Sequence, residues 1–457
     1  MRCSVGMTPR AAGWTLVFLS LHCLASGVAA DARTVVHEDR LGNGLRIALA
    51  PDPAASVVAV SASFDAGSRN EAAAALGSAG RTARAVAARV PGLEASANQE
   101  RAVLSGSFAP RDLPRALESL AAVMRLACRP EAAELAAPPA GSGPLASEAD
   151  VALLRLSYAS FSYAHPAGGA GPDRGAIAPF FCRHYAPNTL VLAIAGRFET
   201  KTALRLARTV FTSLRRRRSP PPVATGARPP SAERRLTLND PGLQAPRIYV
   251  SYVTVRADQP DWYALNILAD ALGNGEGSRM QRALVAAGLA SRFLEGMTEN
   301  RAPSLLRMRV DLSGPTADPA PVEEAMDREL ARLREEPITP AELESARESE
   351  RSAAAESRKT SLDVANTLSR FVTYFDDAKR LDGELPRLLA VTAEDVRRVA
   401  RRYLVKENRA VVVARPWPGS GPAARGLCCE DPGRCRESVV KAPPGRSRRG
   451  ARLRVWP

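Results

Sequence analysis

The chain has 457 residues, 45% of them hydrophobic and 24% charged, which is the composition of a globular protein large enough for two or three domains. The formal net charge of +15 lies almost entirely at the two ends of the chain and in residues 214–235, where seven Arg accompany one Glu. The rest is close to neutral, and the basic segments contain few aromatic residues, which argues against a nucleic-acid-binding protein. The basic segments are solvated linkers, or they attract anionic membrane surfaces or polyanions.

Residues 1–30 have the pattern of a secretory signal peptide. Arg2 and Arg10 precede an apolar run over residues 14–25, and small residues at 28–30 provide a cleavage site, so the mature chain would begin near Asp31. No other stretch of the sequence approaches the ~20 apolar residues that a membrane span needs. We therefore expect an exported protein, periplasmic or extracellular, with no transmembrane segment after signal removal.

Five of the seven Cys remain once the signal peptide is removed. Cys128 and Cys182 lie in apolar stretches and are predicted to be buried thiols rather than disulfide partners. Cys428, Cys429 and Cys435 cluster near the C-terminus, where an oxidising compartment could pair two of them. Their spacing fits no standard zinc finger and no His is near, so no zinc site is expected there.

An approximate internal repeat organises the chain into two similar halves. Each half opens with two strands whose alternating apolar residues predict one buried face, and each ends with a helix that leads into an apolar strand. The opening strands cover residues 45–49 and 57–64 in the first half and residues 235–238 and 247–253 in the second. The closing pairs cover residues 181–185 with 189–195, and 399–403 with 409–414.

Helices are predicted between these strands. Thr339, Pro340 and Glu342 form a capping-box pattern, with Pro at the first helical position, and the helix is expected to run to about residue 358. Thr392 and Asp395 repeat this logic for a later helix. Strands with helices grouped between them predict an α+β protein, with a sheet covered by helices in each half.

The domain boundaries follow from composition. Residues 31–213 and 236–416 are predicted to be two similar α/β sandwich domains, joined by an Arg/Pro-rich linker at 214–235 that cannot sustain a helix or a central strand. Residues 136–143 are predicted to form a loop, and residues 417–457 a basic, disordered tail.

Several short motifs occur in a specific order along the chain. They are found at residues 41–46, 64–71 and 94–97, at His165-Pro166, at 184–188, and in the second half at 261–265, 272–279 and 288–290. In this order and spacing they resemble the pitrilysin/insulinase family of zinc metallopeptidases, in particular its bacterial two-domain and processing-peptidase-like members. The resemblance covers about residues 34–416 and implies two similar α/β sandwich domains.

The zinc site that the resemblance implies is degenerate. The family binds zinc through H-x-x-E-H on one helix, where the spacing places two imidazoles and the general-base carboxylate together. Here Gly80 stands at the first His, Ala83 at the Glu and Arg84 at the second His. The third ligand would fall near Gly141, with Glu148 as a possible substitute if the alignment shifts. Gly and Ala offer no ligand atom and Arg carries a fixed positive charge, so we predict no metal, no cofactor and no catalytic residue.

The other residues that the family would use are also missing. Working members hold substrate with an Arg and a Tyr seven residues apart in the second half, and the matching positions here are Leu284 and Ser291. After signal removal only His37, His165 and His184 remain, and they are far apart in the sequence. We find no nucleophile elbow and no Cys in a recognisable catalytic setting.

The main hypothesis is therefore a non-catalytic family homologue that serves as a partner or scaffold of an active zinc-peptidase subunit, forming a homo- or heterodimer around a peptide-binding chamber. A module that binds peptides or proteins by itself is an alternative. An active metallopeptidase with a relocated zinc site is a further alternative. Nucleic acid is not an expected partner.

Overall fold

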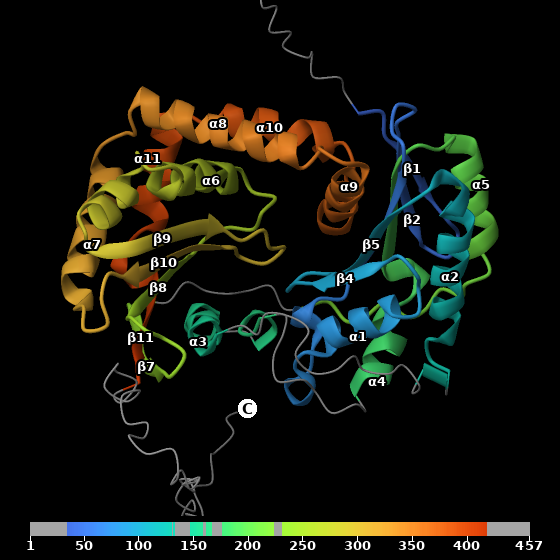
Figure 1. The fold of residues 1–457 in the computed structure, drawn as a ribbon, viewed down its shortest axis with the longest axis horizontal. Coiled ribbons are helices and arrows are strands. Elements are labelled where there is room, and N and C mark those ends of the chain that lie inside the picture. The colour runs from blue at the N-terminus through green and yellow to red at the C-terminus, as the bar shows by residue number, and fades with distance from the viewer. Residues whose placement is uncertain are drawn as a thin grey trace, which may run out of the picture.

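The computed structural model describes residues 34–129, 131–132, 147–158, 161–166, 176–223 and 231–417. Two lobes lie side by side, each built around one sheet (Figure 1). The strands of the first sheet are β1 His37–Arg40, β2 Arg46–Pro51, β3 Val58–Phe64, β4 Glu94–Ala97, β5 Ala102–Phe108 and β6 Leu190–Gly196. Those of the second are β7 Arg234–Asp240, β8 Arg247–Val253, β9 Ala290–Met297, β10 Leu305–Leu312 and β11 Arg409–Pro416. The predicted α+β class is confirmed.

Helices flank both sheets. Those of the first half are α1 Ser78–Ala87, α2 Leu113–Leu126, α3 Glu148–Ser157, α4 Ile177–His184 and α5 Thr200–Phe211. Those of the second half are α6 Pro260–Gly273, α7 Pro319–Glu335, α8 Pro340–Glu356, α9 Ser361–Phe375, α10 Arg380–Leu389 and α11 Ala393–Tyr403. In the described part of the chain, no helix is both long and apolar enough to cross a membrane.

The internal repeat is visible in the topology. The first sheet has the order β1-β2-β6-β3-β5-β4 and the second the order β7-β11-β8-β10-β9. Without β1 the two orders correspond strand for strand, and each contains one parallel pair, β2 with β6 and β7 with β11. The closing helix and strand of each half, α4 with β6 and α11 with β11, are found as predicted.

The predicted helix starts at Thr339 and Thr392 are confirmed by their capping hydrogen bonds. The Thr339 hydroxyl accepts a hydrogen bond from the Glu342 backbone N–H, and the Glu342 carboxylate accepts one from the Thr339 N–H. Thr392 and Asp395 make the same reciprocal pair at the start of α11. Because these bonds join residues three apart, the sequence alone was enough to place both helix starts.

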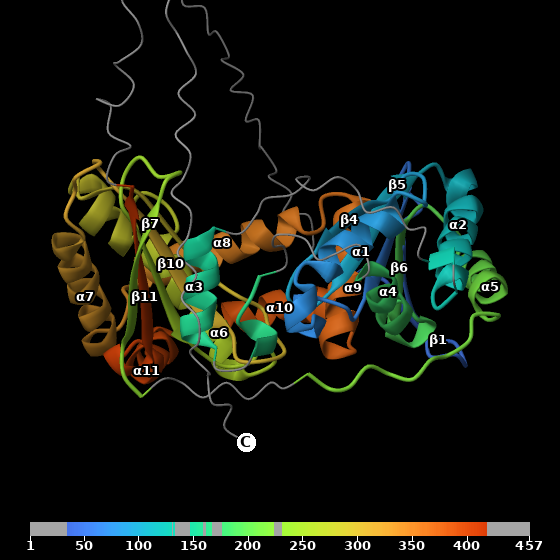
Figure 2. The ribbon, with the colours of Figure 1, turned by 90° about the horizontal axis from the view of Figure 1, so that it is seen from below.

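The prediction of one buried face per strand was wrong for the central strands. Every residue of β3 and β6 is buried, and so are residues 248–253 of β8. On one face of the first sheet lie α1, α2, α4 and α5, whereas α9 from the second half packs on the other face, against an alanine-rich surface with Leu368 and Val372. Reciprocally, α3 from the first half packs on the second sheet, with Leu153 against Tyr249 and Val412 (Figures 1 and 2).

This exchange of helices bears on the predicted boundaries, 31–213 and 236–416, which stay a prediction. Each sheet lies within one predicted domain, except that β7 begins at Arg234, inside the predicted linker. The packing crosses the boundary in both directions, however, because α9 and α3 each cover the sheet of the other half. The predicted loop at 136–143 lies outside the described residues, as do all but the first residue of the predicted tail, 417–457.

The prediction that Cys128 and Cys182 are free thiols was wrong, because they form a disulfide. Cys128 follows the last turn of α2 and Cys182 lies on α4, 54 residues further along the chain. The apolar residues beside each Cys in the sequence belong to the helices α2 and α4. No local sequence pattern shows that the ends of these two helices meet.

Candidate functional site

The helix at the predicted zinc position is α1, and a buried carboxylate holds its start. Glu71 accepts hydrogen bonds from the backbone N–H groups of Gly77 and Ala79, at 2.7 and 2.8 Å. Burial raises the pKa of Glu71 to about 7, although the two backbone donors act in the opposite direction. Its carboxylate therefore satisfies the first turn of the helix rather than facing solvent.

His165 lies behind this carboxylate. Its Nε2 is 3.6 Å from the Glu71 Oε2 and 2.8 Å from the carbonyl oxygen of Ser68, and its side chain is buried. The His165-Pro166 motif is thus packed against the segment that leads into α1. Glu71 and His165 belong to two of the family-like motifs, at residues 64–71 and at His165-Pro166. Their contact was not predicted because they are far apart in the sequence.

The three degenerate positions all lie on α1. Ala83 is fully buried in the first core. Gly80 and Arg84 are partly exposed, and a Cβ placed on Gly80 would meet only the Arg84 Nη1, at 3.5 Å. The guanidinium of Arg84 thus lies over the glycine that replaces the first His. The Nε of Arg84 is buried without a hydrogen-bond partner.

These residues do not fit a zinc ion. Glycine and alanine have no donor atom, and the permanently charged Arg84 repels a dication. In the described ranges, no group of three or more His, Cys, Asp or Glu is arranged to hold a metal. Glu148, the substitute considered from sequence, is exposed in the first turn of α3, the helix that packs on the second sheet, and Gly141 lies outside the described residues. The absence of a cofactor stays a prediction.

The remaining histidines lie apart from this helix face. His37 is exposed on β1. His184 ends α4, where it packs on Phe180 with its Nδ1 buried and unpartnered. Burial and the neighbouring Arg183 lower the pKa of His184 to about 4, so the ring is neutral at ordinary pH.

The two substrate-binding positions of the second half also lack their chemistry. Leu284 is fully buried in the second core, within a short π-helical segment, Gln281–Ala286. Ser291 is exposed on β9 and donates its hydroxyl to the Asp311 carbonyl oxygen at 3.1 Å. Neither residue offers the cation or the phenol that the family pattern requires, and their assignment to these positions stays a prediction.

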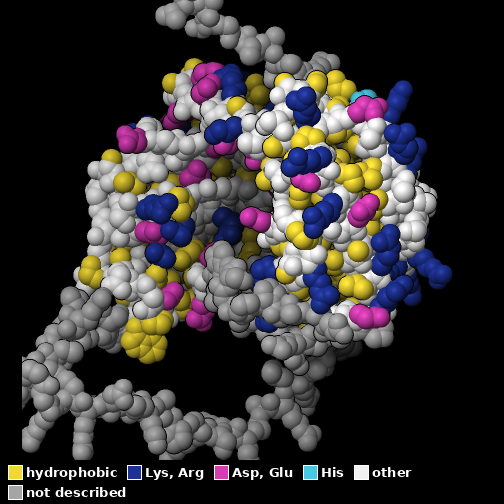
Figure 3. Space-filling view, turned by 45° about the vertical axis from the view of Figure 1, so that its right-hand side comes forward, with side chains coloured by type: hydrophobic (Ala, Val, Ile, Leu, Met, Phe, Trp, Pro, Cys, Tyr) yellow, Lys and Arg dark blue, Asp and Glu magenta, His cyan; other side chains and the backbone are white. Residues whose placement is uncertain are grey.

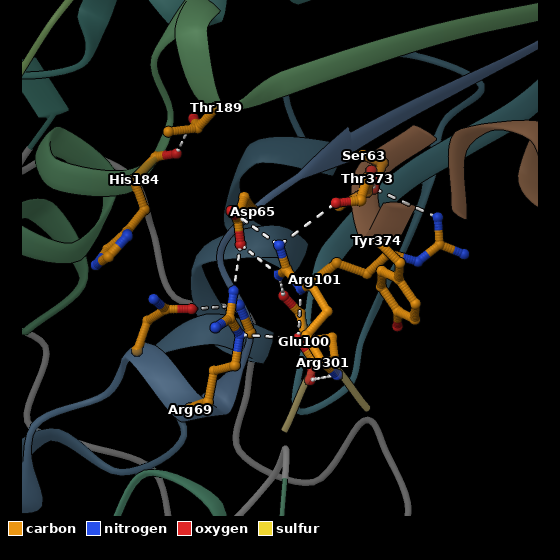
Figure 4. A network of polar contacts seen from close by, with 12 residues as sticks. Ser63, Asp65, Arg69, Glu100, Arg101, His184, Thr189, Arg301, Thr373 and Tyr374 are labelled. Atoms are coloured by element: carbon orange, nitrogen blue, oxygen red, sulfur yellow. Dashed lines mark hydrogen bonds and ion pairs between the residues drawn. The ribbon is translucent and has the colours of Figure 1, made fainter. Parts of the chain in front are cut away.

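A network of charges joins the lobes beside α1 (Figure 4). Arg301, in the turn between β9 and β10, pairs with Asp65 at 2.7 Å and with Glu100 at 2.9 Å. Arg69 pairs with the same two carboxylates, at 2.5 and 3.0 Å. The Tyr163 hydroxyl donates to Glu100 at 2.7 Å. Burial alone would raise the pKa of Asp65, but Arg301 and Arg69 outweigh it and the pKa lies below its ordinary value.

Arg101 extends this network along the interface with α9. Its Nη1 donates to the hydroxyls of Ser369 at 2.9 Å and Ser63 at 3.3 Å, and its guanidinium lies 5.7 Å from the centre of the Tyr374 ring. Burial lowers the pKa of Arg101, whose hydrogen-bond partners are neutral. Sequence reasoning missed this network because its members come from five separate segments.

The chain is similar in structure to known peptidases. A protease from Helicobacter pylori of known structure is 19% identical, with a TM-score of 0.73, and the match covers 84% of this chain and 100% of that one. Residues 173–350 match the model of the peptidase M16 inactive domain. The chain has the fold of an M16 peptidase. The resemblance to the pitrilysin/insulinase family, M16, is thereby confirmed.

Two further structures share the fold. The peptidase M16 inactive domain from Pseudomonas fluorescens is 17% identical, with a TM-score of 0.69, and the match covers 84% of this chain and 98% of that one. The ferredoxin protease FusC, in complex with Arabidopsis ferredoxin, is 17% identical with a TM-score of 0.59, and the match covers 84% of this chain but 48% of FusC. No curated protein matches the sequence. The inactive-domain match supports a non-catalytic homologue, and the solved structures show the fold that this chain shares with them.

Proposed function

We propose that this M16 homologue is a non-catalytic subunit that pairs with an active zinc peptidase and forms part of its peptide-binding chamber. The observation that carries the proposal is the combination of an intact fold with an altered α1. Gly80, Ala83 and Arg84 supply no ligand and no base, whereas the buried pair Glu71 and His165 still holds the helix in place.

The half-length match to FusC supports a paired arrangement. This chain covers 48% of that protease, so a FusC-like chain is long enough to provide two copies of the present fold. A single chain with the present fold would then need a second chain to complete an equivalent assembly, which makes a homo- or heterodimer the expected state.

Metal content and cleavage test the non-catalytic part of the proposal. The purified full chain, incubated with zinc and then desalted, is expected to hold far less than one zinc per chain and to leave an unstructured peptide uncut. Stoichiometric zinc with chelator-sensitive cleavage would instead establish the relocated active site. An active M16 peptidase from the same source, purified together with the chain, tests the partner role through a stable complex in size-exclusion chromatography with light scattering.

Binding of peptides without any partner is the second candidate, and the free edge of β9 favours it. β9 is the last strand of its sheet, and Leu294 on it is 37% exposed. A cavity of about 310 Å³ opens beside it, lined in part by Met297, Arg307 and Asp150. An extended peptide could add to this edge and place a side chain in the cavity. If so, Leu294→Asp should weaken the binding of a labelled unstructured peptide to the isolated chain.

We also propose export of the chain, on the basis of residues 1–30. The disulfide between Cys128 and Cys182 supports this, since disulfides persist mainly in oxidising compartments. The mass of the mature protein, recovered from a cell fraction, tests it. A first residue near Asp31 is expected, and an intact N-terminus in the cytosol would contradict the proposal.

A further inference from the structure

A basic cavity lies on the first lobe, away from α1 and from the lobe interface. It has a volume of about 700 Å³ and lies between the end of α2 and the segment that follows α5. Arginines dominate its lining, and among the described residues no Asp or Glu contributes to it. Five arginines line the cavity: Arg125, Arg129, Arg215, Arg216 and Arg217.

The ion pairing of these five arginines differs from that of other surface arginines. In the described ranges, none of them forms an ion pair with a carboxylate, whereas arginines elsewhere on the surface, such as Arg332 and Arg351, pair with glutamates. The hydrogen bonds that they make go to neutral groups. Arg125 donates to the Val210 carbonyl oxygen at 3.3 Å. Among the residues that the structure describes, no carboxylate therefore offsets their mutual repulsion.

Arg217 is held in a fixed position. It donates to the carbonyl oxygens of Ala127 at 2.6 Å and Cys182 at 2.9 Å, and its Nη1 is 3.1 Å from the Cys128 Sγ. It thus bridges the two helix ends that the disulfide joins. Burial lowers the pKa of Arg217, but guanidinium stays charged at any ordinary pH.

The segment that carries three of the five arginines is anchored as well. The Asn43 side-chain amide donates to the carbonyl oxygens of Phe211 and Leu214, at 2.8 and 3.0 Å. The Asn188 side chain accepts from the Arg217 backbone N–H at 3.1 Å and donates to the Ser219 hydroxyl at 3.3 Å. The backbone at the start of the predicted linker is therefore bound to the first lobe, and the Arg217 guanidinium is fixed before any ligand arrives.

We propose that this cavity binds a ligand with several phosphate groups, either a soluble phosphate chain or the phosphorylated headgroups of a lipid surface. Guanidinium groups match phosphate oxygens in a planar, bidentate geometry, and several of them together favour a multivalent anion over a single carboxylate. The other four arginines of the lining are exposed, whereas Arg217 is partly buried, so a ligand can reach these four side chains from solvent. Apolar lining residues are buried beneath them: Met124, Ala127, Pro187 and Leu214. Figure 3 shows Lys and Arg side chains spread over the surface of the right-hand lobe.

The test uses the full chain, sodium tripolyphosphate and two kinds of vesicle, one of phosphatidylcholine alone and one that also contains phosphatidylglycerol. The test variant is Arg215→Gln with Arg216→Gln, which leaves the anchoring Arg217 intact. The control is Arg332→Gln with Arg402→Gln, which removes the same charge from two exposed arginines outside the cavity. Equal melting temperatures of both variants and the wild type establish that the comparison is between folded proteins.

The cavity variant is expected to bind tripolyphosphate or the anionic vesicles about tenfold or more weakly than the wild type, and the control less than about threefold more weakly. Hydrogen exchange of the backbone amides in residues 211–219 gives a local measurement that the basic C-terminal residues do not affect. These amides should exchange more slowly when ligand is bound. Binding of tripolyphosphate alone indicates a soluble ligand, and binding of anionic vesicles alone indicates a lipid headgroup. Equal losses in the two variants, or unchanged exchange with either probe, overturn the proposal.

Discussion

Two polar regions of the molecule differ in whether their carboxyl groups have cationic partners. At the lobe interface, Asp65 and Glu100 each face two arginines, Arg69 and Arg301. In the second lobe, carboxyl groups gather among α6, β9 and α8 with few cations near them. In the first region opposite charges hold two lobes together, whereas in the second region burial raises the pKa values of the carboxyl groups.

The second region contains Asp270, Glu295 and Glu350. Burial, together with the neighbouring carboxylates, raises the pKa of Glu295 and Glu350 to about 7, and burial raises that of Asp270 to about 6. Glu295 packs directly against the backbone of Gly273, where any side chain would collide with it. The lesson is that a pKa depends on the partners that packing provides, and the sequence does not show which carboxylates receive an arginine.

Loss of Arg301 should have the largest effect on stability. Arg301→Ala leaves Glu100, which is 1% exposed, with Arg69 as its remaining cation, and it removes the ion pairs that Arg301 makes across the lobes. We expect a loss of about 3 kcal/mol in the free energy of unfolding, measured by urea denaturation. The matched change Arg332→Ala removes an exposed ion pair and should cost less than about 0.5 kcal/mol. Equal losses of unfolding free energy in the two variants would show that the network stabilises the protein no more than an exposed ion pair does.

Asp65→Asn should show the pH dependence of a paired carboxylate. The pKa of Asp65 is lower in the folded protein than the ordinary value, so its stabilising effect is present above that ordinary value and is lost as the pH falls through the folded pKa. We expect the variant to be less stable than the wild type at pH 7, on the order of 1 kcal/mol after allowing for its partial exposure, and nearly equal to it in strong acid. Urea denaturation at several pH values measures this. A difference that does not change with pH would contradict the ion-pair explanation.

Glu295→Gln should change the stability of the protein in the opposite direction to Asp65→Asn. The pKa of Glu295 is about 7 when folded, above its ordinary value of 4.5, so its favourable contribution is complete below about pH 4.5 and is lost as the pH rises through 7. The neutral Gln should therefore stabilise the protein relative to the wild type at pH 8, by about 1 kcal/mol, and change little at pH 4. Melting temperatures across this range measure the effect. Destabilisation at pH 8 would mean that the charged carboxylate has a partner.

Ser369→Ala should have an effect no larger than that of the two preceding variants, and it tests an intermediate case, a buried cation with neutral partners. Ser369 is fully buried and accepts a hydrogen bond from Arg101, a cation whose hydrogen-bond partners are neutral. Loss of this acceptor is expected to cost about 1 kcal/mol in the free energy of unfolding, with little dependence on pH between 5 and 8. A loss as large as that for Arg301→Ala would indicate that neutral partners stabilise a buried cation as well as carboxylates do.

Much of the fold was predictable from sequence because its signals are local. Alternation of apolar residues gave the central strands, and the pairs Thr339 with Glu342 and Thr392 with Asp395 gave two helix starts. The order of short motifs gave the family fold, which the structural comparisons confirm. The missing donor atoms of Gly80 and Ala83 and the fixed charge of Arg84 are properties of the residues themselves, whereas their assignment to the zinc-site positions stays a prediction.

What the sequence did not provide were the contacts between distant segments. The second buried face of β3 comes from α9, the disulfide partner of Cys128 lies 54 residues away, and Arg301 meets Glu100 across the lobes. Each of these depends on how two finished elements pack, and side chains that are distant in the chain leave no local pattern that reveals it. The sequence by itself determined which donor atoms α1 lacks, and only the tertiary structure decided which charges are paired, which carboxyl groups have raised pKa values and which arginines line a cavity together.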